Sequence, residues 1–106
     1  MVMKEVETQE EYESLKQESR ERLVVIDFYA EWCGPCKMAS RPYDELSEKY
    51  PDITFVKINI ENLESAVEEN DVNALPTFAF WKDGKRLESI CGTNICKIEE
   101  MVEKFK

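Results

Sequence analysis

The segment from Leu23 to Tyr29 is apolar on both faces of an extended chain and rich in β-branched and aromatic side chains. A strand that exposes one face to water alternates polar with apolar residues, whereas this pattern is typical of a central strand covered on both sides. The segment therefore predicts a sheet whose two faces both carry helices, and it excludes a sheet with one open face.

Strand-like and helix-like patterns alternate on both sides of this segment. Strands are expected at residues 1–6, 23–29, 53–59, 77–81 and 86–90. Helices are expected after Thr8, which forms a capping box with Glu11, from about Cys36 to Tyr50, around residues 63–67 and from Asn94 onward. Pro42 lies inside the second of these helices and is expected to kink it.

The order of these elements predicts a mixed sheet. Strands joined through helices pair in parallel, whereas Asp83-Gly84 is a strong turn signal that makes the last two strands an antiparallel hairpin. We therefore expect an α/β fold, with a central mixed five-stranded sheet flanked by four helices. The length of 106 residues suits a single domain over residues 1–106.

Charge and composition exclude several classes of function. The formal net charge of −9 argues against a nucleic-acid or anionic-membrane partner, since either would need a basic surface. The chain has no histidine, which removes the usual catalytic triads and most zinc chemistry, so no metal site is expected. The first twenty residues are acidic and lack the apolar stretch of a secretory signal, which favours a cytoplasmic location.

The motif Trp32-Cys33-Gly34-Pro35-Cys36 follows the central strand and opens a helix. Cys33 is expected at the helix N-terminus, where free N–H groups and the helix dipole favour a thiolate. Cys36 falls on the inward stripe of the helix and is expected to be shielded. The pattern indicates a reversible redox pair in which exposed Cys33 attacks a disulfide and buried Cys36 resolves the mixed disulfide. A permanent disulfide or half of a zinc site is the alternative.

Asp27 is a carboxylate inside the apolar strand, where burial is expensive and raises the pKa. Such a group is a candidate proton acceptor near neutral pH, or alternatively a core polar group with satisfied hydrogen bonds. Lys57 lies in the next apolar strand and is either the charge partner of Asp27 or an exposed lysine on an edge strand.

Several stretches together resemble the thioredoxin family over almost the whole chain. They are Val25-Ile26-Asp27-Phe28, Trp32-Cys33-Gly34-Pro35-Cys36-Lys37, Leu75-Pro76-Thr77-Phe78, Gly84 and Gly92. The resemblance implies a thioredoxin fold and a protein-disulfide reductase that cycles between a dithiol and a Cys33–Cys36 disulfide.

The resemblance also implies roles for individual residues. Asp27 would deprotonate Cys36, and Gly34, Pro35 and Lys57 would tune the redox pair. Pro76 would be cis and face the cysteines, where a plain turn proline is the alternative. The backbone around Leu75 would pair with an extended client peptide, and Trp32, Leu75 and Gly92 would complete an apolar docking surface.

The implied partners are a flavin- and NADPH-dependent thioredoxin reductase and client proteins with disulfides, such as peroxiredoxins. The chain has no Gly-rich dinucleotide motif, so the nicotinamide would bind to the reductase, and no cofactor is expected on this chain. A monomer is expected, with a thiol-linked dimer as a second possibility. The competing interpretation is a thioredoxin-like binding or scaffold module whose redox pair is idle.

Two places depart from the family pattern. Pro42 lies six residues after Cys36, whereas the family proline usually lies five after the second cysteine. Cys91 and Cys96 are additional, and Cys96 is expected to be exposed in the first turn of the last helix. We treat both as candidate regulatory thiols, and the alternative is that they are small side chains without a role.

Overall fold

Strand β2 (Val24–Tyr29) lies in the middle of the sheet, as its apolar sequence predicts. The structure is a computed structural model that describes residues 3–106. The other strands are β1 (Lys4–Glu5), β3 (Thr54–Asn59), β4 (Thr77–Lys82) and β5 (Lys85–Cys91), and the helices are α1 (Gln9–Glu18), α2 (Gly34–Lys49), α3 (Glu64–Glu69) and α4 (Ile95–Phe105). The sheet order is β1-β3-β2-β4-β5. The mixed five-stranded sheet with four helices is thereby confirmed.

The ends of the sheet follow local sequence chemistry. Strand β1 pairs in parallel with β3 over only two residues, so it is shorter than expected, and residues 1 and 2 of the expected strand lie outside the described residues. The hairpin of β4 and β5 turns at Asp83 and Gly84, whose φ angles of 57° and 80° are both left-handed. A two-residue turn of this hand matches the twist of the strands, which is why Asp-Gly predicts it.

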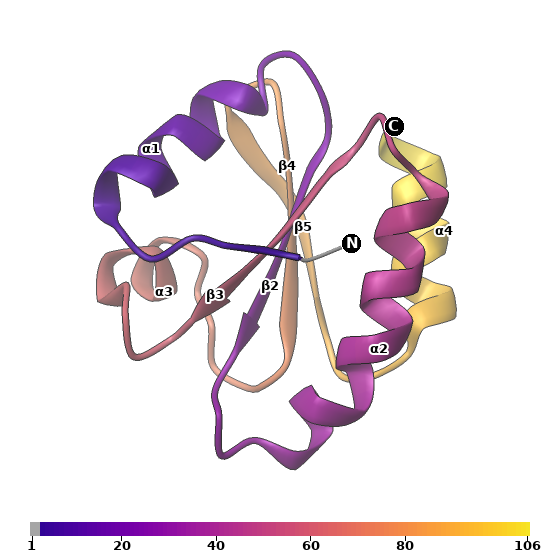
Figure 1. Ribbon diagram of the computed structural model, residues 1–106. Coiled ribbons are helices and arrows are strands. Elements are labelled where there is room, and N and C mark those ends of the chain that lie inside the picture. Colours follow the sequence, from indigo (N-terminus) through magenta and orange to yellow (C-terminus); the bar gives the residue numbers. More distant parts are fainter. Residues whose placement is uncertain (1–2) are drawn as a thin grey trace.

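Helices α1 and α3 lie on one face of the sheet, and α2 and α4 lie on the other (Figure 1). One face packs against Tyr12 of α1 and Ala66 of α3, and the other packs against Tyr43 of α2 and Val102 of α4. No helix within residues 3–106 has the length and apolar character needed to cross a membrane.

The alternation of side chains along β2 decides where Asp27 points. Val24, Ile26 and Phe28 belong to the core on the α1 and α3 side, whereas Val25 belongs to the core on the α2 and α4 side. Because successive side chains point to opposite faces, Asp27 lies on the α2 side with Val25.

The same parity places Lys57 beside Asp27. Phe55 of β3 packs into the core on the α2 side, so Lys57, two residues later, projects to that face too. Lys57 and Asp27 are also register partners between parallel β3 and β2. Strand β3 is interior and the Lys57 side chain is 18% exposed, so the alternative of an exposed edge lysine is wrong.

Helix α2 is fixed to the sheet by Tyr43. This side chain is fully buried, and its hydroxyl lies 3.1 Å from the carbonyl oxygen of Val25 and 2.9 Å from that of Val56. The helix runs through Pro42 as one element, and the kink expected there stays a prediction. Tyr43 therefore sets the face that α2 presents to β2 and β3.

Candidate active site

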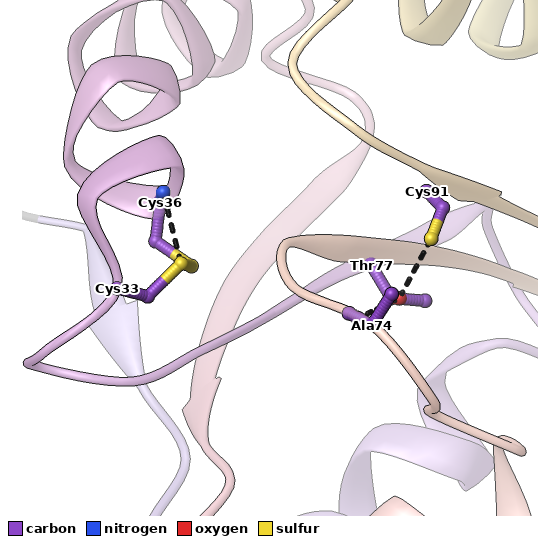
Figure 2. The surroundings of a disulfide bond; sticks show 5 residues. All are labelled: Cys33, Cys36, Ala74, Thr77 and Cys91. Carbon is purple, nitrogen blue, oxygen red and sulfur yellow. Dashed lines mark hydrogen bonds between the residues drawn. A yellow bond between two sulfur atoms is a disulfide. The ribbon is translucent and has the colours of Figure 1, made fainter.

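Cys33 and Cys36 form a disulfide at the N-terminal end of α2, with their Cα atoms 5.3 Å apart (Figure 2). Cys33 is the N-cap residue, and the backbone N–H of Cys36 donates to its Sγ at 3.2 Å. Gly34 and Pro35 form the first turn between them. Free N–H groups and the helix dipole at such an end favour a thiolate, and the thiolate expected on Cys33 of the reduced protein stays a prediction.

The two cysteines do not differ in burial. Each is 5% exposed, so the expectation of an exposed Cys33 beside a shielded Cys36 is wrong for the disulfide form. Both pack with Ala30, and Leu75 packs against this cluster, so the closed disulfide holds the Cys33 sulfur against the protein. The difference between the cysteines lies instead in the cavity that each one lines.

Cys33 lines an apolar groove of about 540 Å³. We use this name for the hollow between Trp32, Cys33, Pro35, Ile60, Val72 and Leu75. Trp32 is 70% exposed, although a large aromatic ring gains by leaving water. An exposed apolar surface beside a reactive sulfur is typical of a binding site for another apolar segment.

The peptide bond from Leu75 to Pro76 is cis, as the resemblance implies, and Leu75 lines the apolar groove. The Thr77 hydroxyl donates to the Ala74 carbonyl at 2.6 Å, which closes the turn around Pro76 (Figure 2). The N–H of Gly92 donates to the Pro76 carbonyl at 3.0 Å, with Gly92 at a left-handed φ of 110°. Among the described residues, Gly92 supports the Pro76 turn and is not part of the groove lining, and its place in the docking surface stays a prediction.

Cys36 lines a different cavity, a polar pocket of about 380 Å³. We use this name for the hollow between Asp27, Cys36, Ser40, Asp44 and Lys57. Asp27 is 2% exposed, and its Oδ1 atom has no hydrogen-bond partner within residues 3–106. No described protein group satisfies this oxygen, which favours the proton acceptor over the alternative of a core polar group held by protein hydrogen bonds.

The pKa of Asp27 is raised to about 7, chiefly by burial; the Lys57 ammonium acts to lower this pKa and the Asp44 carboxylate acts to raise it. A group with a pKa near the working pH both accepts and releases a proton readily. The polar pocket thus contains a carboxyl group suited to proton transfer beside Cys36.

Lys57 makes its direct contacts with α2. Its Nζ donates to the Ser40 hydroxyl at 2.7 Å and lies 3.6 Å from Asp44 Oδ1. As expected, Lys57 is the register partner of Asp27 and acts to lower its pKa. The ion pair of Lys57, however, is with Asp44. Ser40 and Asp44 were not predicted from the sequence, although both follow Cys36 at intervals of four residues and so share its helix face.

Cys91 and Cys96 are both free and exposed. Cys91 ends β5, where its Sγ lies 3.8 Å from the Thr77 hydroxyl (Figure 2). Cys96 is the second residue of α4, so its exposure at the start of that helix agrees with the sequence.

The chain is similar to known proteins over nearly its whole length, in agreement with the redox motif at a helix N-terminus and the cis proline. The family model for thioredoxin matches residues 3–104. The chain belongs to the thioredoxin family. Thioredoxin-1 of Schizosaccharomyces pombe is 35% identical over 102 residues, which cover 96% of this chain and 97% of that relative.

Solved structures agree with this assignment. The thioredoxin of Fasciola hepatica is 36% identical with a TM-score of 0.92, covering 98% of this chain and 100% of that one. A second solved structure concerns the thiol-resolving mechanism of yeast mitochondrial 1-Cys peroxiredoxin via the glutathione and thioredoxin systems. The matching yeast chain in it is 34% identical to this chain. Its TM-score is 0.87, and the match covers 97% of this chain and 95% of the yeast chain.

Membership of the thioredoxin family establishes the reaction. The chain is a thiol-disulfide oxidoreductase, a protein-disulfide reductase whose redox-active pair is Cys33 and Cys36. The redox chemistry resides in this disulfide, and thioredoxins bind no cofactor. The family also implies two kinds of partner, a reductase and client proteins.

Proposed function

We propose that Cys33 is the nucleophile and Cys36 the resolving cysteine of this reductase. The Cys33 thiolate attacks a client disulfide, forms a mixed disulfide and releases one client thiolate. The Cys36 thiolate then attacks Cys33 Sγ, releases the second client thiolate and leaves the Cys33–Cys36 disulfide, so two electrons pass to the client. The observation that carries this proposal is that Cys33 lines the apolar groove while Cys36 lines the polar pocket.

Asp27 acts as the proton acceptor for Cys36 in this cycle. It lines the same pocket as Cys36, its Oδ1 is buried without a hydrogen-bond partner among residues 3–106, and burial raises its pKa to about 7. An ionised Asp27 takes the thiol proton and thereby supplies the thiolate that attacks Cys33. Lys57 tunes this step through its charge.

The apolar groove binds the client. Trp32 and Leu75 provide apolar contact, and the backbone at Leu75 and cis Pro76 pairs with an extended client segment as an added strand does. Gly92 contributes by holding the Pro76 carbonyl. Gly34 and Pro35, which form the turn between the cysteines, tune the redox pair.

The finer identity of the partners follows from the same reaction. The disulfide is reduced again by a thioredoxin reductase, and peroxiredoxins are among the clients, which the yeast match supports. The chain works as one domain over residues 1–106, as a monomer and in the cytoplasm. The yeast match concerns a mitochondrial system, so fractionation of cells that express a tagged chain decides between the two compartments.

Insulin disulfide reduction driven by NADPH and thioredoxin reductase tests the proposal. We expect NADPH consumption with the natural chain and none with Cys33→Ser. A Cys91→Ser, Cys96→Ser double variant is the matched control and should retain full turnover, because both thiols lie outside the two cavities. Absence of turnover with all four cysteines intact contradicts a role of this chain as a protein-disulfide reductase and favours a binding module.

Cys91 and Cys96 are also proposed as regulatory thiols, by oxidation, glutathionylation or a disulfide to a second chain. Their exposure supports this role. Mass spectrometry after mild peroxide should show modification faster than in the denatured protein. Modification at a rate equal to or slower than that in the denatured protein contradicts this regulatory role and the thiol-linked dimer.

A further inference from the structure

The position of the Lys57 ammonium is unexpected. Lys57 and Asp27 are register partners on adjacent strands and project to the same face of the sheet, which is a good arrangement for a direct ion pair. The ammonium instead donates to Ser40 at 2.7 Å and pairs with Asp44 Oδ1 at 3.6 Å. Asp27 Oδ1 meanwhile is buried and has no hydrogen-bond partner within residues 3–106.

The contacts to Lys57 come from the helix face that carries Cys36. Cys36, Ser40 and Asp44 are spaced four residues apart on α2, so they form one row above the polar pocket. The Tyr43 hydroxyl holds α2 to the carbonyls of β2 and β3, which fixes this row over the sheet. Asp44 is partly exposed, yet its Oδ1 is buried and lies on the Lys57 side.

We propose that Asp44 is a positioning residue for the exchange reaction: with Ser40 it holds the Lys57 ammonium against α2 and so limits the action of that charge on the Asp27 carboxyl. The inference rests on the proposed role of Asp27 as the proton acceptor. Six further ionisable groups line the pocket with Asp27: Glu5 of β1, Tyr29 of β2, Glu31 of the loop before α2, Lys37 and Asp44 of α2, and Lys57 of β3. Among the charges, those that act most strongly on Asp27 are Lys57 and Asp44.

Removal of the Asp44 charge has a definite sign. The ammonium of Lys57 lowers the pKa of Asp27 and the carboxylate of Asp44 raises it. Asp44→Asn deletes the repulsion and also releases Lys57 toward Asp27, and both changes favour the ionised carboxylate. Asp27 then titrates at lower pH and becomes a weaker base.

The experiment is an NMR titration that follows the carboxyl carbon of Asp27 in the oxidised protein. We expect Asp44→Asn to lower the midpoint by roughly 0.5 pH unit or more. Glu45→Gln removes the same charge from the neighbouring exposed position of α2 and should leave the midpoint unchanged. The acidic limb of the pH–rate profile for disulfide reduction should move in the same direction as the midpoint. An unchanged midpoint in Asp44→Asn overturns the inference.

Two further variants separate positioning from the direct effect of the Asp44 charge. Ser40→Ala removes a Lys57 contact without changing any charge, and it should also lower the midpoint, by less than Asp44→Asn. Lys57→Met should raise the midpoint, and Asp44→Asn in that background should shift it less than in the natural chain. An equal shift in both backgrounds means that Asp44 does not act through Lys57 and overturns its positioning role. No shift in Ser40→Ala overturns the part assigned to Ser40.

These results stay separate from the test of Asp27 itself. If Asp27→Asn retains the full reduction rate, Asp27 is not the proton acceptor, even where Asp44 controls its titration. If Asp27→Asn slows reduction but Asp44→Asn leaves the Asp27 midpoint in place, the proposed function stands and the role of Asp44 is lost.

Discussion

The apolar groove and the polar pocket flank one disulfide but are built from different parts of the fold. The groove consists largely of residues from the connections between elements, such as Trp32 and Leu75, together with Cys33. The charged groups at the centre of the pocket project from β2, β3 and α2, as Asp27, Lys57 and Asp44 do. Loops adapt to different partners, whereas strands and helices hold side chains at fixed distances.

This difference separates two requirements of disulfide exchange. A reductase with many clients needs a surface that accepts varied segments, and it also needs proton transfer at a defined distance. Because Cys33 lines one cavity and Cys36 the other, each sulfur meets an environment that suits its proposed step. Changes in the groove should therefore alter client binding, and changes in the pocket should alter pH dependence.

The largest expected effect is on stability and comes from the pocket. Burial raises the pKa of Asp27 from an ordinary value of 3.8 to about 7, so the natural chain loses stability as pH rises from about 4 to 7. In the Asp27→Asn variant, the side chain at this position is an amide, which carries no charge at any of these pH values. At pH 8 the variant should be more stable by up to about 4 kcal/mol in urea unfolding of the oxidised protein.

The same comparison at pH 4 is the control, because Asp27 is then protonated in the folded state and the stability gain should largely disappear. A gain of equal size at pH 4 and pH 8 contradicts the assignment of the effect to ionisation of Asp27.

A smaller effect is expected on the rate. Asp27→Asn should slow insulin reduction at pH 7 by about 10- to 100-fold, at the lower end of what a general base contributes, because part of the Cys36 thiol ionises unaided. The affinity for client should remain unchanged, since Asp27 lies in the polar pocket and not in the groove. A rise in KM without a fall in kcat would contradict the role of Asp27 in proton transfer.

The smallest effect is expected in the groove. Trp32→Ala should raise the KM for a disulfide client by about tenfold, the scale of an aromatic anchor at an interface, and leave the pH–rate profile in place. Met38→Ala is the matched control, because Met38 is 74% exposed on α2 but outside the groove lining among the described residues. Equal effects of the two substitutions indicate general surface hydrophobicity rather than a binding groove.

Much of the fold could be predicted because local chemistry and tertiary structure agree. The apolar β2 segment required helices on both faces, Asp83-Gly84 specified the hairpin, and Thr8 with Glu11 formed the capping box. The first strand was shorter than predicted, because β1 pairs with β3 at only two residues. No residue type in the sequence marks where this pairing begins or ends.

The site was predicted less completely, because two of its properties depend on tertiary distance. Cys33 is as buried as Cys36 in the disulfide form, since Leu75 packs against the pair from a distant part of the chain. Lys57 pairs with Asp44 instead of Asp27, although strand register favours Asp27. The four-residue spacing of Cys36, Ser40 and Asp44 was visible in the sequence, but its meaning depends on which strand lies beneath that helix face.

The most direct test of the separation between the two cavities is a trapping experiment with Cys36→Ser and Cys33→Ser, both in the Cys91→Ser, Cys96→Ser background. A disulfide-bonded client peptide is mixed with each reduced variant at pH 7, and mixed-disulfide formation is followed by mass spectrometry. We predict rapid capture through Cys33 in the first variant and capture at least about tenfold slower through Cys36 in the second. Equal capture rates through the two cysteines contradict this prediction.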